Sequence, residues 1–302
     1  MRVGDESLFW LVIFYSHINA HSIPDILRLL LVVASSLFSL KSSFLSFLFV
    51  WQPLMSELAE ICLHKYASCP LLNLLSPMNP QVFNPATQKL FEYPSNGKPT
   101  CTSKKPAEQR RNELLAAVGP HLLSTCEAHT RDLMCSPPGS HILIETFFNT
   151  NVPGDKKPLA EAIAKCVAAT DPSDDSRHGK AGLDDQPDEE DVGPAAHVLG
   201  HKVMQKLLTR ENETVKEGEH ILWEAFFNEL HNFEKVEQRL TAWAKHNRMA
   251  FVLVALVNAC PEARKSDVKA FFAPVVKAIR ASKATTACAG TTKLLEVLEA
   301  LK

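Results

Sequence analysis

The sequence lacks the short motifs from which catalytic, metal and nucleotide sites are commonly built. Only 11 of its 302 residues are glycine, and no glycine-rich loop of the kind that cradles a phosphate is present. The eight cysteines include no C-x-x-C pair and no close grouping with histidine, which argues against zinc and thiol-redox sites. No nucleophile or paired carboxylate occurs in a recognisable context. We therefore expect no enzyme, no metal and no cofactor.

An excess of charge of one sign is also missing. The formal net charge is −2 and the pI is about 6.6, so the chain as a whole is not an electrostatic binder of nucleic acid. Any such activity must reside in local patches. Most cysteines stand beside leucine, valine or alanine in helix-like runs, which is typical of reduced core residues in an intracellular protein.

The first fifty residues differ from the rest. Residues 1–50 form a hydrophobic leader in which Arg28 and Lys41 interrupt long apolar runs. The length suffices to cross a bilayer, but Lys41 lies near the middle of the span, where a charge costs about 2.5 to 3.5 kcal/mol. Three interpretations stay open: a spurious extension of the gene model, a membrane span or signal, and a buried helix pair.

After Met55 the apolar residues recur at helical spacing, and an alternating strand pattern is almost absent. The sequence therefore predicts an all-α protein. Following Arg110 it predicts three short helices, because Gly119-Pro120 and Pro137-Pro138-Gly139 interrupt the apolar pattern. Further apolar stripes predict helices over residues 222–230, 236–243, 251–257, 268–279 and 294–301.

Some of these helices resemble one another, which indicates a repeat array. Each of these helices has two variable positions followed by three largely apolar ones. The alignment places Ser140 with Ser68, His201 and Ala250, and so matches "SHILIETFF" to "SCPLLNLL", "HKVMQKLL" and "AFVLVALV". The spacing between them is irregular, so we expect divergent repeats with insertions. One insertion, residues 171–191, has nine acidic residues, two basic ones and no core-forming periodicity. It predicts a disordered acidic loop.

Five segments carry a resemblance to a known family. In order along the chain they are "KYASCPLLNLLSPMNPQVF", "SKKPAEQRRNELLAAVGPHLLSTCEAH", "GSHILIETFF", "HVLGHKVMQKLLTRE" and "HNRMAFVLVALVNAC", and the ending "TTKLLEVLEALK" is similar as well. Together they resemble the C-terminal half of the pumilio homolog 3 family, also called Puf-A or penguin. That half comprises the last Puf-like repeats and the CPL region. The resemblance covers residues 51–302, without the leader and without the repeats expected upstream, so the chain looks like a C-terminal piece.

The resemblance implies a right-handed, superhelical Puf/HEAT-like helical repeat array. It further implies residence in the nucleus and nucleolus, sequence-tolerant binding of structured RNA or DNA, and a part in ribosome biogenesis and pre-rRNA processing. Ribosome-assembly proteins are further candidate partners. A membrane is a partner only if the leader is genuine.

The aligned helices permit a test of base readout. In a Puf repeat that reads bases, two variable residues are followed three positions later by a polar one. Here the third residue is apolar in three helices, as Leu72, Ile144 and Val254, and polar only as Gln205. We therefore expect the helix that follows Gly139 to serve mainly in packing against its neighbours. The candidate contacts are Ser140, His141, His201, Lys202 and Gln205.

Cations offer a sequence-independent alternative, since lysine and arginine neutralise phosphates whatever the base. Lys98, Lys104, Lys105, Arg110 and Arg111 lie close together in the sequence, and a weaker set runs from Arg264 to Lys283. We therefore expect RNA binding through the phosphate backbone. Two other functions stay open: a protein-interaction scaffold within a ribosome-assembly complex, and a membrane-tethered helical adaptor.

Overall fold

The structure is a computed structural model that describes residues 57–83, 106–172, 192–215, 219–281 and 288–301, together with residues 85 and 88. The leader and almost all of the acidic segment lie outside these ranges, so both predictions about them stay predictions. In the described ranges every regular element is a helix, which confirms the all-α prediction. None of these helices has both the length and the apolar character needed to cross a membrane.

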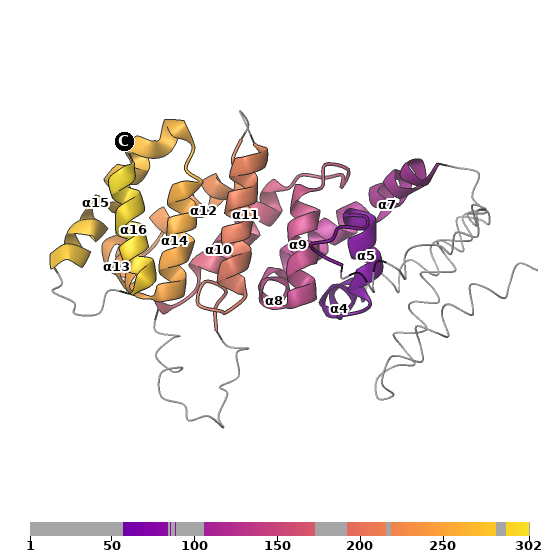
Figure 1. The fold of residues 1–302 in the computed structure, drawn as a ribbon, viewed down its shortest axis with the longest axis horizontal. Coiled ribbons are helices and arrows are strands. Elements are labelled where there is room, and N and C mark those ends of the chain that lie inside the picture. Colours follow the sequence, from indigo (N-terminus) through magenta and orange to yellow (C-terminus); the bar gives the residue numbers. More distant parts are fainter. Residues whose placement is uncertain are drawn as a thin grey trace, which may run out of the picture.

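The helices form two layers (Figure 1). The first layer consists of helices that lie side by side in chain order: α5 (Ser68–Leu75), α9 (Pro137–Phe148), α11 (Gly200–Thr214), α14 (Asn247–Asn258) and α16 (Ala289–Ala300). The second layer covers one side of the first: α7 (Ala107–Ala128), α8 (Thr130–Cys135), α10 (Lys157–Ala168), α12 (Ile221–His231), α13 (Val236–Lys245) and α15 (Lys265–Ala281). Helix α4 (Leu58–Leu63) precedes α5, and the short 3₁₀ helix η3 (Glu262–Arg264) precedes α15.

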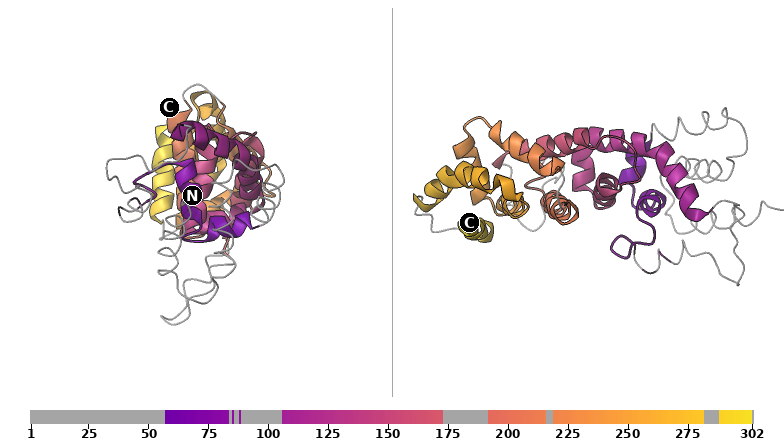
Figure 2. Two further views of the ribbon diagram at one scale, coloured as in Figure 1. Left: turned by 90° about the vertical axis from the view of Figure 1, so that its right-hand side faces the viewer. Right: turned by 90° about the horizontal axis from the view of Figure 1, so that it is seen from above.

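The repeat alignment is confirmed by this layering. All four aligned segments are helices of the first layer, namely α5, α9, α11 and α14, and α16 continues the series. Seen from above, the array is bent and the first layer lies inside the bend (Figure 2). We therefore call it the inner layer. Such an array buries each helix against its neighbours in a continuous core, in which Trp223 and Trp243 are fully buried.

The turns that lead into the inner helices share a construction. The backbone N–H of each aligned residue Ser68, Ser140, His201 and Ala250 donates to the carbonyl of the residue four positions earlier. Three of those earlier residues are histidines whose Nδ1 accepts a backbone N–H at or just before the start of the helix: His64 from Ala67 at 3.1 Å, His197 from Leu199 at 3.1 Å and His246 from Met249 at 3.3 Å. His246 is the N-cap of α14, whereas His64 and His197 hold the turns that precede α5 and α11.

One predicted helix break is wrong and another is displaced by one residue. Helix α7 runs through Gly119 and Pro120, although the missing N–H of a proline leaves the carbonyl four residues earlier without a helical partner. Here that residue, Ala116, is exposed, so water can satisfy the carbonyl. Gly119 serves packing instead, because a Cβ at this position would lie 2.7 Å from Cδ of Pro153. The break predicted at residues 137–139 lies at Ser136, between α8 and α9, because a proline is tolerated at the first position of a helix, where Pro137 stands.

Candidate nucleic-acid interface

Helix α11 presents a polar stripe on the inner layer. Its opposite face is buried through Val203, Met204, Leu207 and Leu208, so the positions between them are directed away from the core. These positions recur at helical spacing and carry cations and amide or hydroxyl groups: Lys202, Gln205, Lys206, Thr209, Arg210, Glu213 and Thr214.

This stripe forms most of the wall of an open groove of about 650 Å³. The remaining wall comes from Asn79 and Gln81, in the segment after α5, and from Glu145 on α9. Lys202 and Lys206 are exposed, and within the described residues neither forms an ion pair. Their ammonium groups are therefore available to an anion that enters the groove.

Arg210 is held in place from α9. Its Nη1 donates to Glu145 Oε1 at 2.8 Å and its Nη2 to Oε2 at 3.4 Å, while its guanidinium carbon lies 4.7 Å from the centre of the Phe148 ring. Glu145 is buried and Arg210 is about a third exposed. The ion pair neutralises Glu145 inside the groove and fixes the guanidinium of Arg210 at the edge of the groove. There the remaining N–H donors of Arg210 can hydrogen-bond a ligand.

His141 lies beside the same groove. Burial lowers the pKa of its imidazole, nearby Lys206 lowers it further, and Glu145 opposes the shift. The ring is thus neutral at pH 7. It can exchange hydrogen bonds with a ligand but adds no charge to the groove.

The other two predicted contacts on these helices have internal partners. The Ser140 hydroxyl is buried and donates to the carbonyl of Pro137 at 2.8 Å. His201 lies half-buried, with its Nδ1 2.8 Å from the carbonyl of His197. Burial is the main cause that lowers the pKa of His201, and the hydrogen bond to His197 opposes it. Of the predicted reading set, the structure brings together His141, Lys202 and Gln205.

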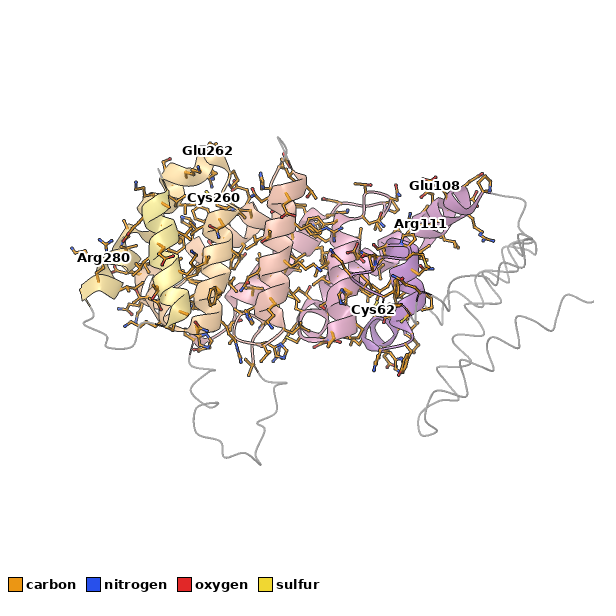
Figure 3. The ribbon with its side chains drawn as sticks, viewed as in Figure 1. Cys62, Glu108, Arg111, Cys260, Glu262 and Arg280 are labelled. Atoms are coloured by element: carbon orange, nitrogen blue, oxygen red, sulfur yellow. The ribbon has the colours of Figure 1, made fainter. Side chains whose placement is uncertain are left out.

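The N-terminal cation cluster is divided by the structure. Lys98, Lys104 and Lys105 lie outside the described residues. Arg110 and Arg111 are on α7 in the second layer, and neither lines the groove; Figure 3 shows Arg111 on this helix. Arg111 donates from Nε to the carbonyl of Leu74 at 2.7 Å and from Nη2 to that of Leu75 at 2.8 Å. Its guanidinium therefore closes the C-terminus of α5, a structural role that the charge pattern did not indicate.

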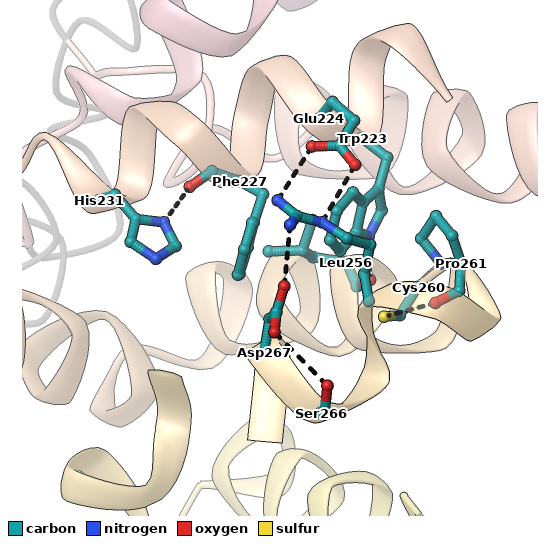
Figure 4. A network of polar contacts seen from close by, with 10 residues as sticks. Trp223, Glu224, Phe227, His231, Leu256, Cys260, Pro261, Ser266 and Asp267 are labelled. Carbon is teal, nitrogen blue, oxygen red and sulfur yellow. Dashed lines mark hydrogen bonds and ion pairs between the residues drawn. The ribbon is translucent and has the colours of Figure 1, made fainter. Parts of the chain in front are cut away.

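The weaker cation set near the C-terminus is largely occupied by partners within the chain. Arg264 contacts both Glu224 and Asp267 (Figure 4). Lys265 pairs with Glu262, and Arg280 with Glu299. These contacts link α12 to η3, η3 to α15 and α15 to α16. Although exposed pairs contribute little stability, they leave few of these cations for phosphate.

The sequence analysis did not predict five of the groove residues: Lys206, Thr209, Arg210, Asn79 and Gln81. For the two cations a signal was present, since Lys202, Lys206 and Arg210 follow one another at four-residue spacing on an amphipathic helix. Nothing in the sequence indicated that Asn79 and Gln81 face α11.

Across the described ranges, no group of three or more His, Cys, Asp or Glu side chains is placed to hold a metal ion, and none of the seven described cysteines forms a disulfide.

The family model of the CPL (NUC119) domain matches residues 63–220, which is more than half of the chain and includes helix α11 with its groove. The chain belongs to the CPL (NUC119) domain family. This CPL chain is also similar to curated relatives. It is 30% identical over 253 residues to Pumilio homolog 3 of Mus musculus, covering 82% of the chain and 35% of the relative. To Pumilio homolog 3 of Homo sapiens it is 27% identical over 233 residues, covering 77% and 33%.

The chain thus spans about a third of the length of these relatives. Two solved structures share the fold of this CPL chain. The crystal structure of human Puf-A superimposes with a TM-score of 0.59 at 24% identity, covering 82% of the chain and 43% of that structure. Human Puf-A in complex with DNA superimposes with a TM-score of 0.61 at 24% identity, covering 89% and 46%. At this identity the likeness shows the helical-repeat fold alone.

Proposed function

We propose that the chain binds nucleic acid, RNA in particular, through the phosphate backbone and with little dependence on base sequence. The observation that carries the proposal is the α11 groove, where the exposed Lys202 and Lys206 stand in line with Arg210. Cations set in a groove can neutralise phosphates at fixed positions. The structure of human Puf-A with DNA supports the same ligand class.

Sequence tolerance follows from the residues that would have to read bases. Leu72, Ile144 and Val254 are buried and apolar, and hence can neither reach nor hydrogen-bond a base edge. Gln205 alone among the four aligned third positions lies in the groove with a polar group. A single amide provides at most one base preference, whereas the cations act on every sequence alike.

We further propose that this binding serves ribosome assembly and pre-rRNA processing in the nucleolus. Support comes from the relationship to Pumilio homolog 3 together with the five family segments in the sequence. The described part of the chain adds a groove suited to phosphates.

The test is a salt titration of binding to several unrelated RNAs of equal length. In the variant Lys202→Ala/Lys206→Ala, affinity should fall by similar factors for every RNA. The slope of log affinity against log salt should flatten by about 1.4, which is two phosphate contacts at about 0.7 each for a single strand. The matched control is Lys157→Ala/Lys165→Ala, which removes two exposed lysines from α10 in the second layer and should leave the slope unchanged.

Two results would overturn the proposal. One is a strong preference of the wild-type chain for one RNA, on the order of a thousandfold, which phosphate contacts cannot produce. The other is an unchanged affinity and slope in the double lysine variant. In that case the groove would be better explained as a docking site for a protein within an assembly complex.

A further inference from the structure

The groove on α11 is elongated along that helix. Seven of its ten wall residues are on α11, from Lys202 to Thr214, and they form a single stripe at helical spacing. A rise of 1.5 Å per residue gives the stripe a length of about 18 Å. Only three residues come from elsewhere, and all three lie on the side toward α9 and α5. A ligand that fills this groove therefore extends parallel to the helix axis.

The cations follow the same direction. Lys202, Lys206 and Arg210 are spaced by about 6 Å along the axis, one helical turn apart, which is comparable to the separation of neighbouring phosphates on one strand. The helices on either side do not continue the charge. The positions equivalent to Lys206 are Glu145 on α9 and Ala255 on α14, and the position equivalent to Lys202 on α14 is Phe251.

From this arrangement we infer that a single nucleic-acid strand lies along α11, with successive phosphates at Lys202, Lys206 and Arg210, rather than crossing the array with one nucleotide for each repeat. The inference rests on the proposed nucleic-acid binding and gives that binding a direction. A strand that crossed the inner layer would contact only one of these three cations. A strand along α11 meets all three.

The rest of the groove is consistent with a short single-stranded segment. Its volume of about 650 Å³ is in the range of roughly 300 to 1,000 Å³ that accommodates a small ligand, so it has room for a short segment of one strand. Gln205, Thr209, Asn79 and Gln81 offer neutral hydrogen-bonding groups for sugars and base edges. Of the two acids in the groove wall, Glu145 is already paired with Arg210, and Glu213 lies near the C-terminal end of the cation row.

Two matched substitutions distinguish the directions. Thr214→Lys extends the cation row along α11, because residue 214 follows Arg210 at the same four-residue spacing. Asn258→Lys places the same charge on α14, at the position equivalent to Thr209, and so extends the row across the array. Both residues are exposed and both end their helices, where an added cation is favourable. Each variant therefore adds one charge to an intact fold.

The measurement is binding of oligouridylate of ten nucleotides over a series of salt concentrations. Thr214→Lys should tighten binding several-fold and steepen the salt slope by about 0.7, while Asn258→Lys should change affinity less than twofold. An equal or larger gain from Asn258→Lys, or no gain from Thr214→Lys, overturns the inferred direction. If instead the wild-type chain binds no oligonucleotide, the proposed function itself fails, so the two failures are distinguishable.

Discussion

The guanidinium of Arg210 on α11 donates to the carboxylate of Glu145 on α9 at 2.8 Å, and the two groups come from residues 65 positions apart in the sequence. The pair therefore joins neighbouring repeats and at the same time forms part of the groove wall. It couples the stability of the inner layer to the charge of the candidate interface.

Removing either member of this pair should lower stability, but the two substitutions should change RNA affinity in opposite directions. Glu145→Gln leaves Arg210 without its counter-ion, so the free energy of unfolding should fall by about 1 to 2 kcal/mol. The groove loses one negative charge, and RNA affinity should rise at low salt. Denaturant unfolding and RNA titration at two salt concentrations check both effects. Arg210→Gln is the matched partner: it should destabilise similarly but weaken binding. Parallel changes in RNA affinity in the two variants would contradict the placement of Arg210 in the interface.

Arg111 should prove structural and not part of the interface. Arg111→Ala leaves the carbonyls of Leu74 and Leu75 without its two donors, although Asn149 Nδ2 still donates to Leu75 at 2.7 Å. Unfolding free energy should fall by about 1 to 3 kcal/mol, with the salt slope of RNA binding unchanged. Arg111→Lys should recover only part of the loss, since an ammonium group cannot donate in the planar two-pronged geometry. A flatter salt slope in the folded Arg111→Ala variant would show that Arg111 contacts phosphate.

The histidines that precede the inner helices should stabilise the inner layer. His197 and His246 are buried, and their Nδ1 atoms accept the backbone N–H groups of Leu199 and Met249. In His197→Ala/His246→Ala these N–H groups lose their acceptors, so the free energy of unfolding should fall by about 1 to 3 kcal/mol.

The variant His197→Asn/His246→Asn tests this mechanism, since the asparagine side chain also offers an acceptor at the start of a helix. Denaturant unfolding should give the asparagine variant a stability between those of the wild type and the alanine variant. Equal unfolding free energies for the asparagine and alanine variants would exclude the accepted hydrogen bonds as the cause.

Glu211 should make the stability of the fold depend on pH. Its buried carboxylate accepts the backbone N–H groups of Leu222 and Trp223, each at 2.9 Å, and so caps α12 from α11. Burial raises the pKa of Glu211, and the two hydrogen bonds oppose the shift. The pKa of Glu211 is higher in the folded chain than in the unfolded chain, so protonation of Glu211 stabilises the fold. This contribution is fully present at pH values below the pKa of an ordinary carboxyl group, and it is lost as the pH rises through the folded-state pKa.

In Glu211→Gln that part of the pH profile should disappear. At pH 7 the variant should also lose about 1 to 3 kcal/mol, because the amide oxygen replaces only one of the two acceptors. Unfolding free energies at pH 4.5, 5.5 and 7 measure both effects. Glu213→Gln is a suitable control, since Glu213 is exposed on the same helix and within the described residues forms no ion pair. Equal profiles for the wild type and Glu211→Gln would contradict the assignment.

The sequence by itself determined the helices and the repeat. Apolar residues at helical spacing fix which face of a segment is buried, and this information is local. For that reason the alignment of Ser68, Ser140, His201 and Ala250 identified four helices of the inner layer before any packing was known. It also predicted that most aligned positions are unsuited to reading a base. Helix ends were less predictable, because the effect of Gly119 and Pro120 depended on the exposure of Ala116 and the packing of Pro153.

Only the tertiary structure decided which polar residues meet. The cations of residues 98–111 stand out in the sequence, yet the packing of α7 against α5 commits Arg111 to two backbone carbonyls. The groove depends on Asn79, Glu145 and Lys206, three residues from distant segments that come together because α5, α9 and α11 pack side by side. Charge and hydrogen-bonding capacity are properties of a residue, whereas availability to a ligand depends on its neighbours in space.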